Sequence, residues 1–227
     1  MARLPRLAVP GHSHLVLQRG HNGERVFADE ADRRAYLAAL ADASAQHGLR
    51  VHAWGLADSQ VLLLAEPQHA ASLSRAMQAV GRSYVAAFNR RHGRRGTLWD
   101  GRFRAGIVES PRFALAALLF AETAGGRLGE AELKDDSRSS RAHHLGQRLP
   151  LVSDHSVYWA LGNTPFDREV AYRRMVDQGW GSDQRLALVN AAEHGWVLGT
   201  PSFAERVAEQ AARPVQPRRR GRPTRIR

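Results

Sequence analysis

The chain has 227 residues, 43% of them hydrophobic, which is enough to bury a sizeable core. It contains no cysteine, which excludes disulfides, thiolate metal sites and cysteine nucleophiles. There is no run of about 20 apolar residues and no apolar block of a signal peptide near residue 1, so we expect a cytoplasmic protein without a membrane segment.

The formal net charge of +11 is concentrated in two segments. Residues 75–104 hold eight arginines and one acid, Asp100, and residues 213–227 hold seven arginines and no acid. A local excess of positive charge is typical of proteins that bind polyanions, because contacts with phosphates release counterions from nucleic acid. A solvated basic surface is the alternative, although arginine promotes solubility less well than aspartate or glutamate. The pattern favours nucleic acid as the partner.

The periodicity of apolar residues predicts an alternation of strands and helices in the first half of the chain. In chain order these are a strand at 14–19, a helix at 29–46 capped by Asp29, a hairpin of strands at 51–56 and 61–65, a helix at 70–92, a strand near 107–108 and a helix at 113–123. The order β-α-β-β-α-β-α predicts an α+β fold of the ferredoxin-like type.

The second half of the chain shows a weaker pattern. We expect a loop at 130–148 and helices at 167–177, 183–193 and 202–212. The last residues have too few apolar side chains to repay the entropy of ordering. These patterns divide the chain into a ferredoxin-like domain at 1–126, a helical C-terminal extension at 127–212 and a disordered Arg-rich tail at 213–227.

Several motifs carry a resemblance to one family. They are Val51-His52-Ala53-Trp54, Asn89-Arg90-Arg91-His92-Gly93, Gly96-Thr97-Leu98-Trp99-Asp100-Gly101-Arg102-Phe103, Gly195-Trp196-Val197-Leu198-Gly199 and the Arg-Gly-Arg-Pro ending. In these motifs, and nearly from end to end, the chain resembles the REP-associated tyrosine transposases, a bacterial branch of the IS200-like family.

The resemblance implies a single-tyrosine endonuclease of the HUH class that acts on single-stranded hairpin DNA. In this family two histidines on one strand face hold Mg²⁺ or Mn²⁺, because strand side chains repeat every two residues. A tyrosine on the last helix attacks the phosphodiester and forms a phosphotyrosine. A polar residue one turn later completes the metal site.

The chain departs from the family at each of these four positions. The His-x-His strand reads Gln60-Val61-Leu62, the tyrosine position is Phe120, and the last metal-ligand position is Ala124. A leucine cannot coordinate a cation and a phenylalanine has no hydroxyl. The catalytic and metal residues are therefore degenerate, no cofactor is expected, and the balance is against an enzyme. A helix displaced by one turn is the alternative explanation of the mismatch.

Other histidines offer weak substitutes for the missing ligands. His12-Ser13-His14 is the only H-x-H in the chain, and we interpret it as a solvated or DNA-contacting pair. His143 and His144 are sequence neighbours in an expected loop, and we interpret them as surface residues.

The tyrosines and a nearby glutamate are also poor candidates for catalysis. Glu122 lies beside the lost nucleophile, but without a metal or a nucleophile it has nothing to activate. The four tyrosines are interpreted as packing residues. They are Tyr36, Tyr84, Tyr158 and Tyr172.

The candidate DNA-binding residues combine arginine with aromatic side chains, which suits phosphate contact and base stacking. They are Arg90, Arg91, Arg94, Arg95, Trp99, Arg102, Phe103, Arg104, Arg220 and Arg222. Trp99 and Phe103 have an equally good alternative role as core residues. Arg220-Gly221-Arg222-Pro223 resembles an AT-hook, for which the alternative is an unspecific basic tail.

The sequence therefore predicts a DNA-binding protein derived from a transposase, which recognises hairpin or single-stranded DNA at the nucleoid and has no nuclease activity. It could act as a homodimer. The alternative is an active transposase whose metal ligands and nucleophile come from residues that do not align or from an active partner.

Overall fold

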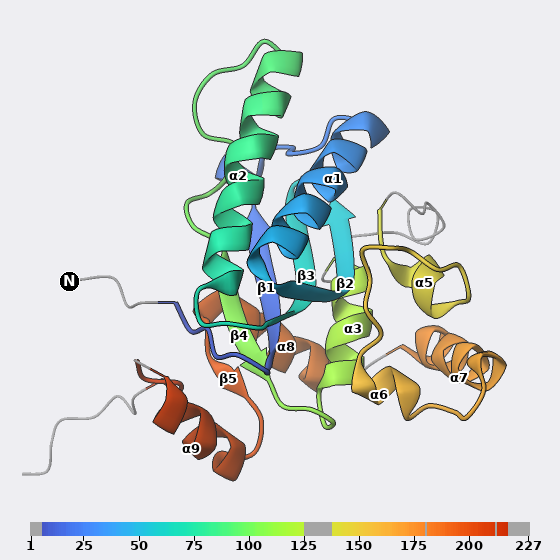
Figure 1. The fold of residues 1–227 in the computed structure, drawn as a ribbon. Coiled ribbons are helices and arrows are strands. Elements are labelled where there is room, and N and C mark those ends of the chain that lie inside the picture. Colours follow the sequence, from blue (N-terminus) through green and yellow to red (C-terminus); the bar gives the residue numbers. More distant parts are fainter. Residues whose placement is uncertain (1–5, 125–137, 180, 212, 218–227) are drawn as a thin grey trace, which may run out of the picture.

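A five-stranded sheet lies at the centre of the molecule, with helices on both of its faces (Figure 1). The structure is a computed structural model that describes residues 6–124, 138–179, 181–211 and 213–217. The strands are β1 (Ser13–Arg19), β2 (Leu49–Ala57), β3 (Gln60–Pro67), β4 (Arg104–Val108) and β5 (Val197–Leu198). The helices are η1 (His21–Gly23), α1 (Glu30–His47), α2 (Ser72–Arg91), α3 (Ala114–Glu122), α5 (Arg141–His144), α6 (Ser156–Trp159), α7 (Pro165–Gln178), α8 (Ser182–His194) and α9 (Pro201–Gln210).

The strand order is β2-β3-β1-β4-β5. The first four strands are antiparallel to their neighbours, and β5 is parallel to β4. Together with α1, α2 and α3 they follow the predicted order β-α-β-β-α-β-α, so the prediction of a ferredoxin-like α+β fold is confirmed. The start of α1 is also confirmed, because the Asp29 side chain accepts a hydrogen bond from the backbone N–H of Asp32.

The two central strands, β1 and β3, are buried on both faces of the sheet. Val16 and Leu63 belong to the core beneath α1 and α2, whereas Leu17 and Leu62 belong to the core beneath α3 and α8. Side chains of a strand alternate between faces, so strands that are apolar at successive positions require a helical layer on each side.

The C-terminal half of the chain supplies part of the second layer. Leu188 and Ala192 of α8 pack in the same core as Phe120 of α3, and β5 extends the sheet. The three predicted helices are present as α7, α8 and α9, but β5 and the packing of α8 on the sheet were not predicted from sequence. Val215, in the predicted tail, is buried, and its carbonyl accepts a hydrogen bond from Val197.

Two glycines allow the helices of the second layer to approach the sheet closely. A Cβ atom at Gly55 on β2 would lie 2.0 Å from the carbonyl oxygen of Ala121 on α3. A Cβ atom at Gly106 on β4 would lie 2.3 Å from the carbonyl oxygen of Ala191 on α8. At both places the strand passes directly under helix backbone, and only glycine fits.

Three histidines that were expected near the surface are buried, so these predictions are wrong. His14 is fully buried, where its Nδ1 is 2.7 Å from the carbonyl oxygen of His12 and its Nε2 accepts a hydrogen bond from the N–H of Val9. His143 and His144 lie on α5, inside the expected loop, and are also buried. For His144 the sequence pattern does not reveal this, because the rings that cover it, Tyr158 of α6 and Tyr172 of α7, come later in the chain.

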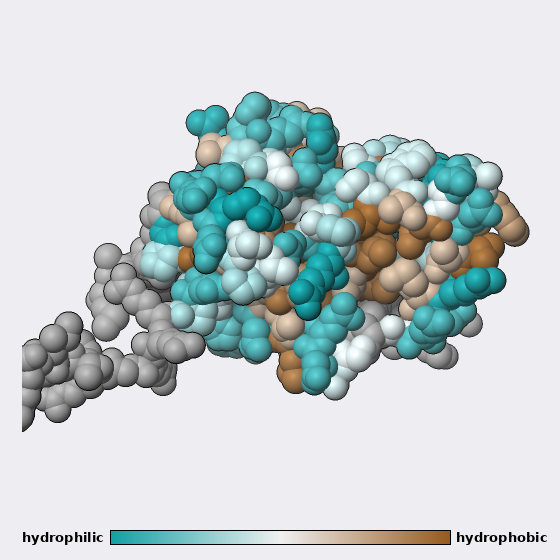
Figure 2. Space-filling view, turned by 90° about the horizontal axis from the view of Figure 1, so that it is seen from below, coloured by the Kyte–Doolittle hydropathy of each residue, from teal (hydrophilic) through white to brown (hydrophobic). Residues whose placement is uncertain are grey.

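The surface has both polar and apolar regions. The view from below shows hydrophobic residues gathered beside a hydrophilic surface (Figure 2). The most exposed large hydrophobic side chains of the described residues are Trp159, Phe166 and Leu186, on α6, α7 and α8. No helix in the described ranges is long and apolar enough to cross a membrane.

The close approach at Gly55 predicts a loss of stability on substitution. Gly55→Ala would push β2 and α3 apart, and we expect the free energy of unfolding to fall by about 1–3 kcal/mol. Gly81→Ala is the matched control, because a Cβ atom at Gly81 on α2 meets nothing within 4 Å. The free energy of unfolding of Gly81→Ala should rise by up to about 1 kcal/mol, because alanine favours a helix more than glycine does. Urea unfolding checks both, and equal effects of the two variants would contradict the packing of α3 on β2.

Burial of His14 predicts that stability depends on pH. Burial lowers the pKa of His14 from its usual 6.5 to about 4, so the folded protein stays unprotonated there between these values while the unfolded chain takes up a proton. The stabilisation that comes from keeping His14 unprotonated is fully present above about pH 6.5 and is lost as the pH falls towards 4. It amounts to about 3 kcal/mol at most.

We expect the urea midpoint of the wild type to fall steeply between pH 6.5 and 4, and to fall less steeply in His14→Gln. His69→Gln is the control, since His69 is exposed. An unchanged slope in His14→Gln would show that His14 does not carry the effect.

Candidate nucleic-acid interface

The four positions at which the sequence departs from the nuclease motifs lie together. Gln60 and Leu62 are on the same face of β3, and both line a cavity of about 200 Å³ with Phe120 of α3. The side-chain amide of Gln60 donates a hydrogen bond to the carbonyl oxygen of Ala124 at 2.5 Å. Residues from two motifs far apart in sequence therefore meet at one place. This is the geometry expected if the alignment of both motifs is correct.

The residues of this cavity do not fit a divalent metal ion. Leu17, Leu62 and Phe120 offer no ligand atoms, and the carboxylate of Glu193, which also lines the cavity, pairs with Arg19. Gln60 offers a single amide oxygen, and its amide nitrogen donates to backbone. Among the described residues, no group of three histidine, aspartate or glutamate side chains is placed to hold a metal. The cavity supplies no nucleophile at position 120 either, because phenylalanine has no hydroxyl.

A larger groove of about 780 Å³ lies between α2 and residues 99–103. Four arginines line it, and none of its described lining residues is acidic. They are Arg6, Arg75, Arg82 and Arg102. None of the four makes an ion pair with a described residue, so the groove is a concentration of uncompensated positive charge.

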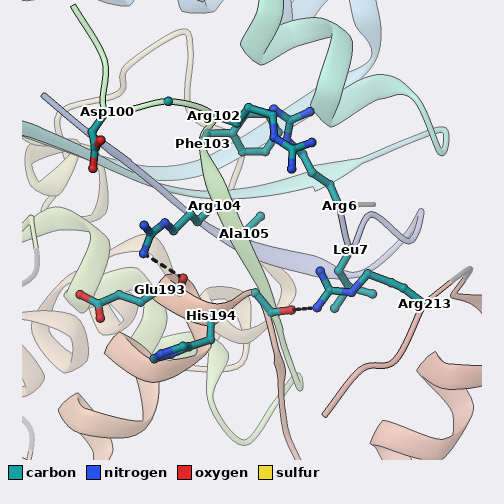
Figure 3. A pocket seen from close by; sticks show the side chains of 12 residues that line it. Arg6, Leu7, Asp100, Arg102, Phe103, Arg104, Ala105, Glu193, His194 and Arg213 are labelled. Atoms are coloured by element: carbon teal, nitrogen blue, oxygen red, sulfur yellow. Dashed lines mark hydrogen bonds between the residues drawn. The ribbon is translucent and has the colours of Figure 1, made fainter. Parts of the chain in front are cut away.

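A second cavity, of about 370 Å³, adjoins this groove and shares Arg6, Arg102 and Phe103 with it (Figure 3). Arg104 donates a hydrogen bond to the backbone carbonyl of Glu193, and Arg213 donates one to the carbonyl of Gly195. Asp100 and Glu193 also line this cavity, so it is of mixed charge. Its far wall comes from α8 and the residues after it.

Arg6 and Arg102 lie near each other beside Phe103 (Figure 3). The guanidinium carbon of Arg6 is 4.2 Å from the centre of the Phe103 ring. Burial, and then the positive charge of Arg102, lower the pKa of Arg6 below its usual range. Two cations that lie near each other and form no ion pair with a described acid favour an anion between them. A phosphate is an anion of this kind.

The structure divides the predicted DNA-binding residues into separate groups. Arg102 and Arg104 line the cavities, whereas Arg90, Arg91, Arg94 and Arg95 lie at the far end of α2 and just beyond it. Arg91 pairs with Asp29 and Asp32, and Arg94 with Glu24, so part of that cluster holds the chain together. Arg220 and Arg222 lie outside the described residues.

Sequence reasoning missed Arg6, Arg75 and Arg82 as groove residues. Arg75 and Arg82 are seven residues apart on α2, a spacing of two helical turns that places them on one side of the helix. That spacing was a usable signal. No comparable sequence signal points to Arg6, because only the fold brings residue 6 to α2.

Trp99 and Phe103 are buried, with 6% exposure each. The Trp99 ring packs against Tyr36 and Tyr84 at 6.2 Å between ring centres, and all three belong to the core beneath α1 and α2. Of the two roles considered from sequence, the structure favours packing for both aromatic residues. Their edges still line the groove.

Glu122, two residues after Phe120, is the centre of a buried hydrogen-bond network. Its carboxylate lies 2.7 Å from Nδ1 of His144 and accepts hydrogen bonds from the hydroxyls of Ser140 at 3.0 Å and Tyr172 at 2.7 Å. Burial, and then Glu122, raise the pKa of Tyr172 well above its usual value. Tyr172 is fully buried, so its hydroxyl is not available to a DNA strand. The network joins α3 to α5 and α7.

Packing is also confirmed for Tyr36, Tyr84 and Tyr158, which are buried.

The sheet order, the helices on both faces and the position of α3 define a ferredoxin-like domain. A solved REP-associated tyrosine transposase bound to a REP hairpin is similar to this chain, with a TM-score of 0.50 and 12% identity over 69% of this chain and 93% of that chain. At this identity the likeness is one of fold, and the chain has the fold of that transposase.

A second solved structure, of a protein from Deinococcus radiodurans assigned as a transposase, is less similar. Its TM-score is 0.37, with 21% identity over 51% of this chain and 92% of that chain. No protein-family model matches the chain, and no curated protein matches it.

The Glu122 network predicts a rank order of destabilisation. Tyr172→Phe removes one hydrogen bond and should lower the free energy of unfolding by about 1 kcal/mol. Glu122→Leu leaves three buried donors without an acceptor and should cost at least about 3 kcal/mol. Thermal and urea unfolding measure both. An effect of Glu122→Leu no larger than that of Tyr172→Phe would show that the network does not anchor α5 and α7.

Proposed function

We propose that this protein binds DNA, in hairpin or single-stranded form, through the arginine-lined groove beside α2, and that it does not cut the DNA. The observation that carries the proposal is the groove itself, where Arg6, Arg75, Arg82 and Arg102 converge without an acid among the described lining residues. Every arginine that meets a phosphate releases counterions, so a groove of this charge attracts nucleic acid.

The fold supports DNA as the nucleic acid. The REP-associated tyrosine transposase with the same fold was solved bound to a REP hairpin. A hairpin presents two phosphate backbones close together and an unpaired loop or end. A groove with arginines from α2, from residue 6 and from residue 102 suits such a ligand.

The degenerate site supports a binding protein in preference to a nuclease. Cleavage through a phosphotyrosine requires a hydroxyl where Phe120 stands and metal ligands where Gln60 and Leu62 stand. Phe120 and Leu62 instead contribute to the core beneath α3 and α8. The competing function is an active transposase that uses other residues or an active partner.

The remaining parts of the chain have proposed roles in the same function. We divide the chain into the transposase-type domain at 1–126, the helical extension at 127–212 and the basic tail at 213–227. The tail, with Arg220 and Arg222, would add affinity for DNA, and the protein would reside at the nucleoid. A homodimer would present two grooves to one DNA.

Labelled DNA hairpins incubated with the protein in Mg²⁺ or Mn²⁺ test both halves of the proposal. We expect retarded bands on a native gel and no covalent adduct on a denaturing gel. A covalent adduct would establish the competing function, and the modified residue could then be mapped. Absence of retardation with every hairpin and every single strand at low salt would overturn DNA binding.

Charge removal in the groove gives a quantitative prediction. Arg6→Ala and Arg102→Ala should each weaken hairpin binding, and each should reduce the slope of log affinity against log salt by about 0.7–0.9. Arg173→Ala, at an exposed site on α7, removes the same charge outside the groove and is the control. Fluorescence anisotropy over a salt series measures the slopes. Equal slopes for the groove variants and the control would exclude this groove as the DNA site.

A further inference from the structure

Residues 138–157 form a strap along the edge of the sheet. β2 is the first strand in the order β2-β3-β1-β4-β5, so one of its sides faces away from the other strands. The N–H of Leu56 donates to the carbonyl of Arg138 at 2.7 Å, and the N–H of Ser153 donates to the carbonyl of Val51 at 2.8 Å. The helices of the strap, α5 and α6, lie on the β2 side of the sheet (Figure 1). An open edge strand offers its backbone groups to other chains, and here the strap occupies them.

Two buried histidines accept hydrogen bonds from the backbone of the strap. His143 accepts at Nδ1 from the N–H of Leu149, at 3.0 Å. His155 accepts at Nδ1 from the N–H of Val157, at 3.1 Å, and so caps α6. Both histidines are 4% exposed. A ring nitrogen that accepts a hydrogen bond carries no proton, so the proton of each neutral ring is on Nε2.

The Nε2 proton of each ring also has a partner. Nε2 of His155 lies 2.9 Å from the hydroxyl oxygen of Ser13 on β1, and Nε2 of His143 lies 3.0 Å from a carboxylate oxygen of Asp154. A second proton can bind only at Nδ1, where a backbone N–H already points. Protonation of either ring therefore breaks a hydrogen bond of the strap and leaves a buried N–H without an acceptor.

The surroundings of His155 also disfavour a positive charge. Its ring centre lies 4.8 Å from that of His52 on β2. Burial, and then the neighbouring His52 and His144, lower the pKa of His155 to about 4. Glu66 on β3 faces Nε2 of His52 at 4.0 Å. Its charge therefore favours a proton on His52, and a protonated His52 repels a proton on His155.

The charged groups around His143 are already paired. Asp154 pairs with Arg148 at 2.7 Å as well as with His143. Glu122 on α3 lies 2.7 Å from Nδ1 of His144. Burial, and then His144, lower the pKa of His143, while Asp154 acts in the opposite direction. His143 therefore stays neutral in the folded strap at neutral pH.

We propose that the strap closes the edge of β2 at neutral pH and leaves it on acidification, when His143 and His155 take up protons. In a released strap both rings are in water, where the usual pKa of histidine is 6.5, whereas in the closed strap the pKa of His155 is about 4. The closed state is therefore favoured most above about pH 6.5, and this advantage is lost as the pH falls towards 4. Release leaves the backbone groups of β2 open to a strand of another chain. None of the described residues that line the groove beside α2 belongs to the strap, so the proposal is independent of DNA binding.

Hydrogen exchange of the full chain, followed by NMR at pH 7 and pH 5, tests the proposal. Protection factors are compared, because they correct for the intrinsic pH dependence of exchange. The N–H groups of Leu56, Ser140 and Ser153 bond between β2 and the strap. We expect their protection to fall at least about tenfold between pH 7 and pH 5. At pH 5 it should also lie at least about tenfold below that of the β1–β3 amides, because the opening is local.

Replacing both histidines by asparagine separates protonation from packing. The side-chain oxygen of asparagine can take the place of Nδ1 as an acceptor, asparagine is a good N-cap, and it does not titrate. In the double variant His143→Asn, His155→Asn, the three strap amides should lose little protection between pH 7 and pH 5. His69→Asn, at an exposed position, is the matched control and should behave as the wild type.

Three outcomes would overturn the proposal. The strap amides could keep their protection at pH 5, they could lose it only together with the β1–β3 amides, or they could lose it equally in the double variant. If the double variant does not fold, NMR titration of the histidine rings in the wild type decides. His143 and His155 should take up protons only as the strap amides lose protection. Rings that become protonated while these amides stay protected would refute the role of the histidines.

Discussion

The structure depends on one constraint, which is that the central strands of the sheet are apolar on both faces. Val16 and Leu63 face α1 and α2, and Leu17 and Leu62 face the opposite way. A sheet of this kind cannot leave one face in water, so a second helical layer must cover it. The single helix α3 covers the part over β2 and β3. The part over β1 and β4 is covered by α8, so the C-terminal half completes the core.

The covering helix α8 also shapes the cavities on either side of it. Arg19 at the end of β1 pairs with Glu193 near the end of α8, and Arg104 donates a hydrogen bond to the Glu193 backbone. Glu193 lines both the cavity at Phe120 and the mixed-charge cavity at Arg104. The same packing that closes the core therefore separates the cavity at Phe120 from the cavity at Arg104.

The degenerate positions can be understood in the same physical terms. A metal site needs polar side chains on the inner face of β3 and α3, and these are costly to bury without the metal. Leu62 and Phe120 instead add apolar surface to the core. The Gln60 amide finds a backbone partner in Ala124. Apolar residues at these positions avoid the cost of burying polar groups that have no partner.

Local patterns in the sequence determined the elements of the ferredoxin-like domain and the Asp29 cap, because alternation and helical spacing are set by neighbouring residues. The four positions at which ligand and nucleophile residues are replaced were indicated by the resemblance to the transposase family. Tertiary structure alone decided the rest. Burial of His144 beside Glu122, the pairing of Arg91 with Asp29, the addition of β5 and the meeting of Arg6 with Arg102 all join residues far apart in the chain. No periodicity records such contacts, since they arise only when the sheet and its two helical layers have assembled.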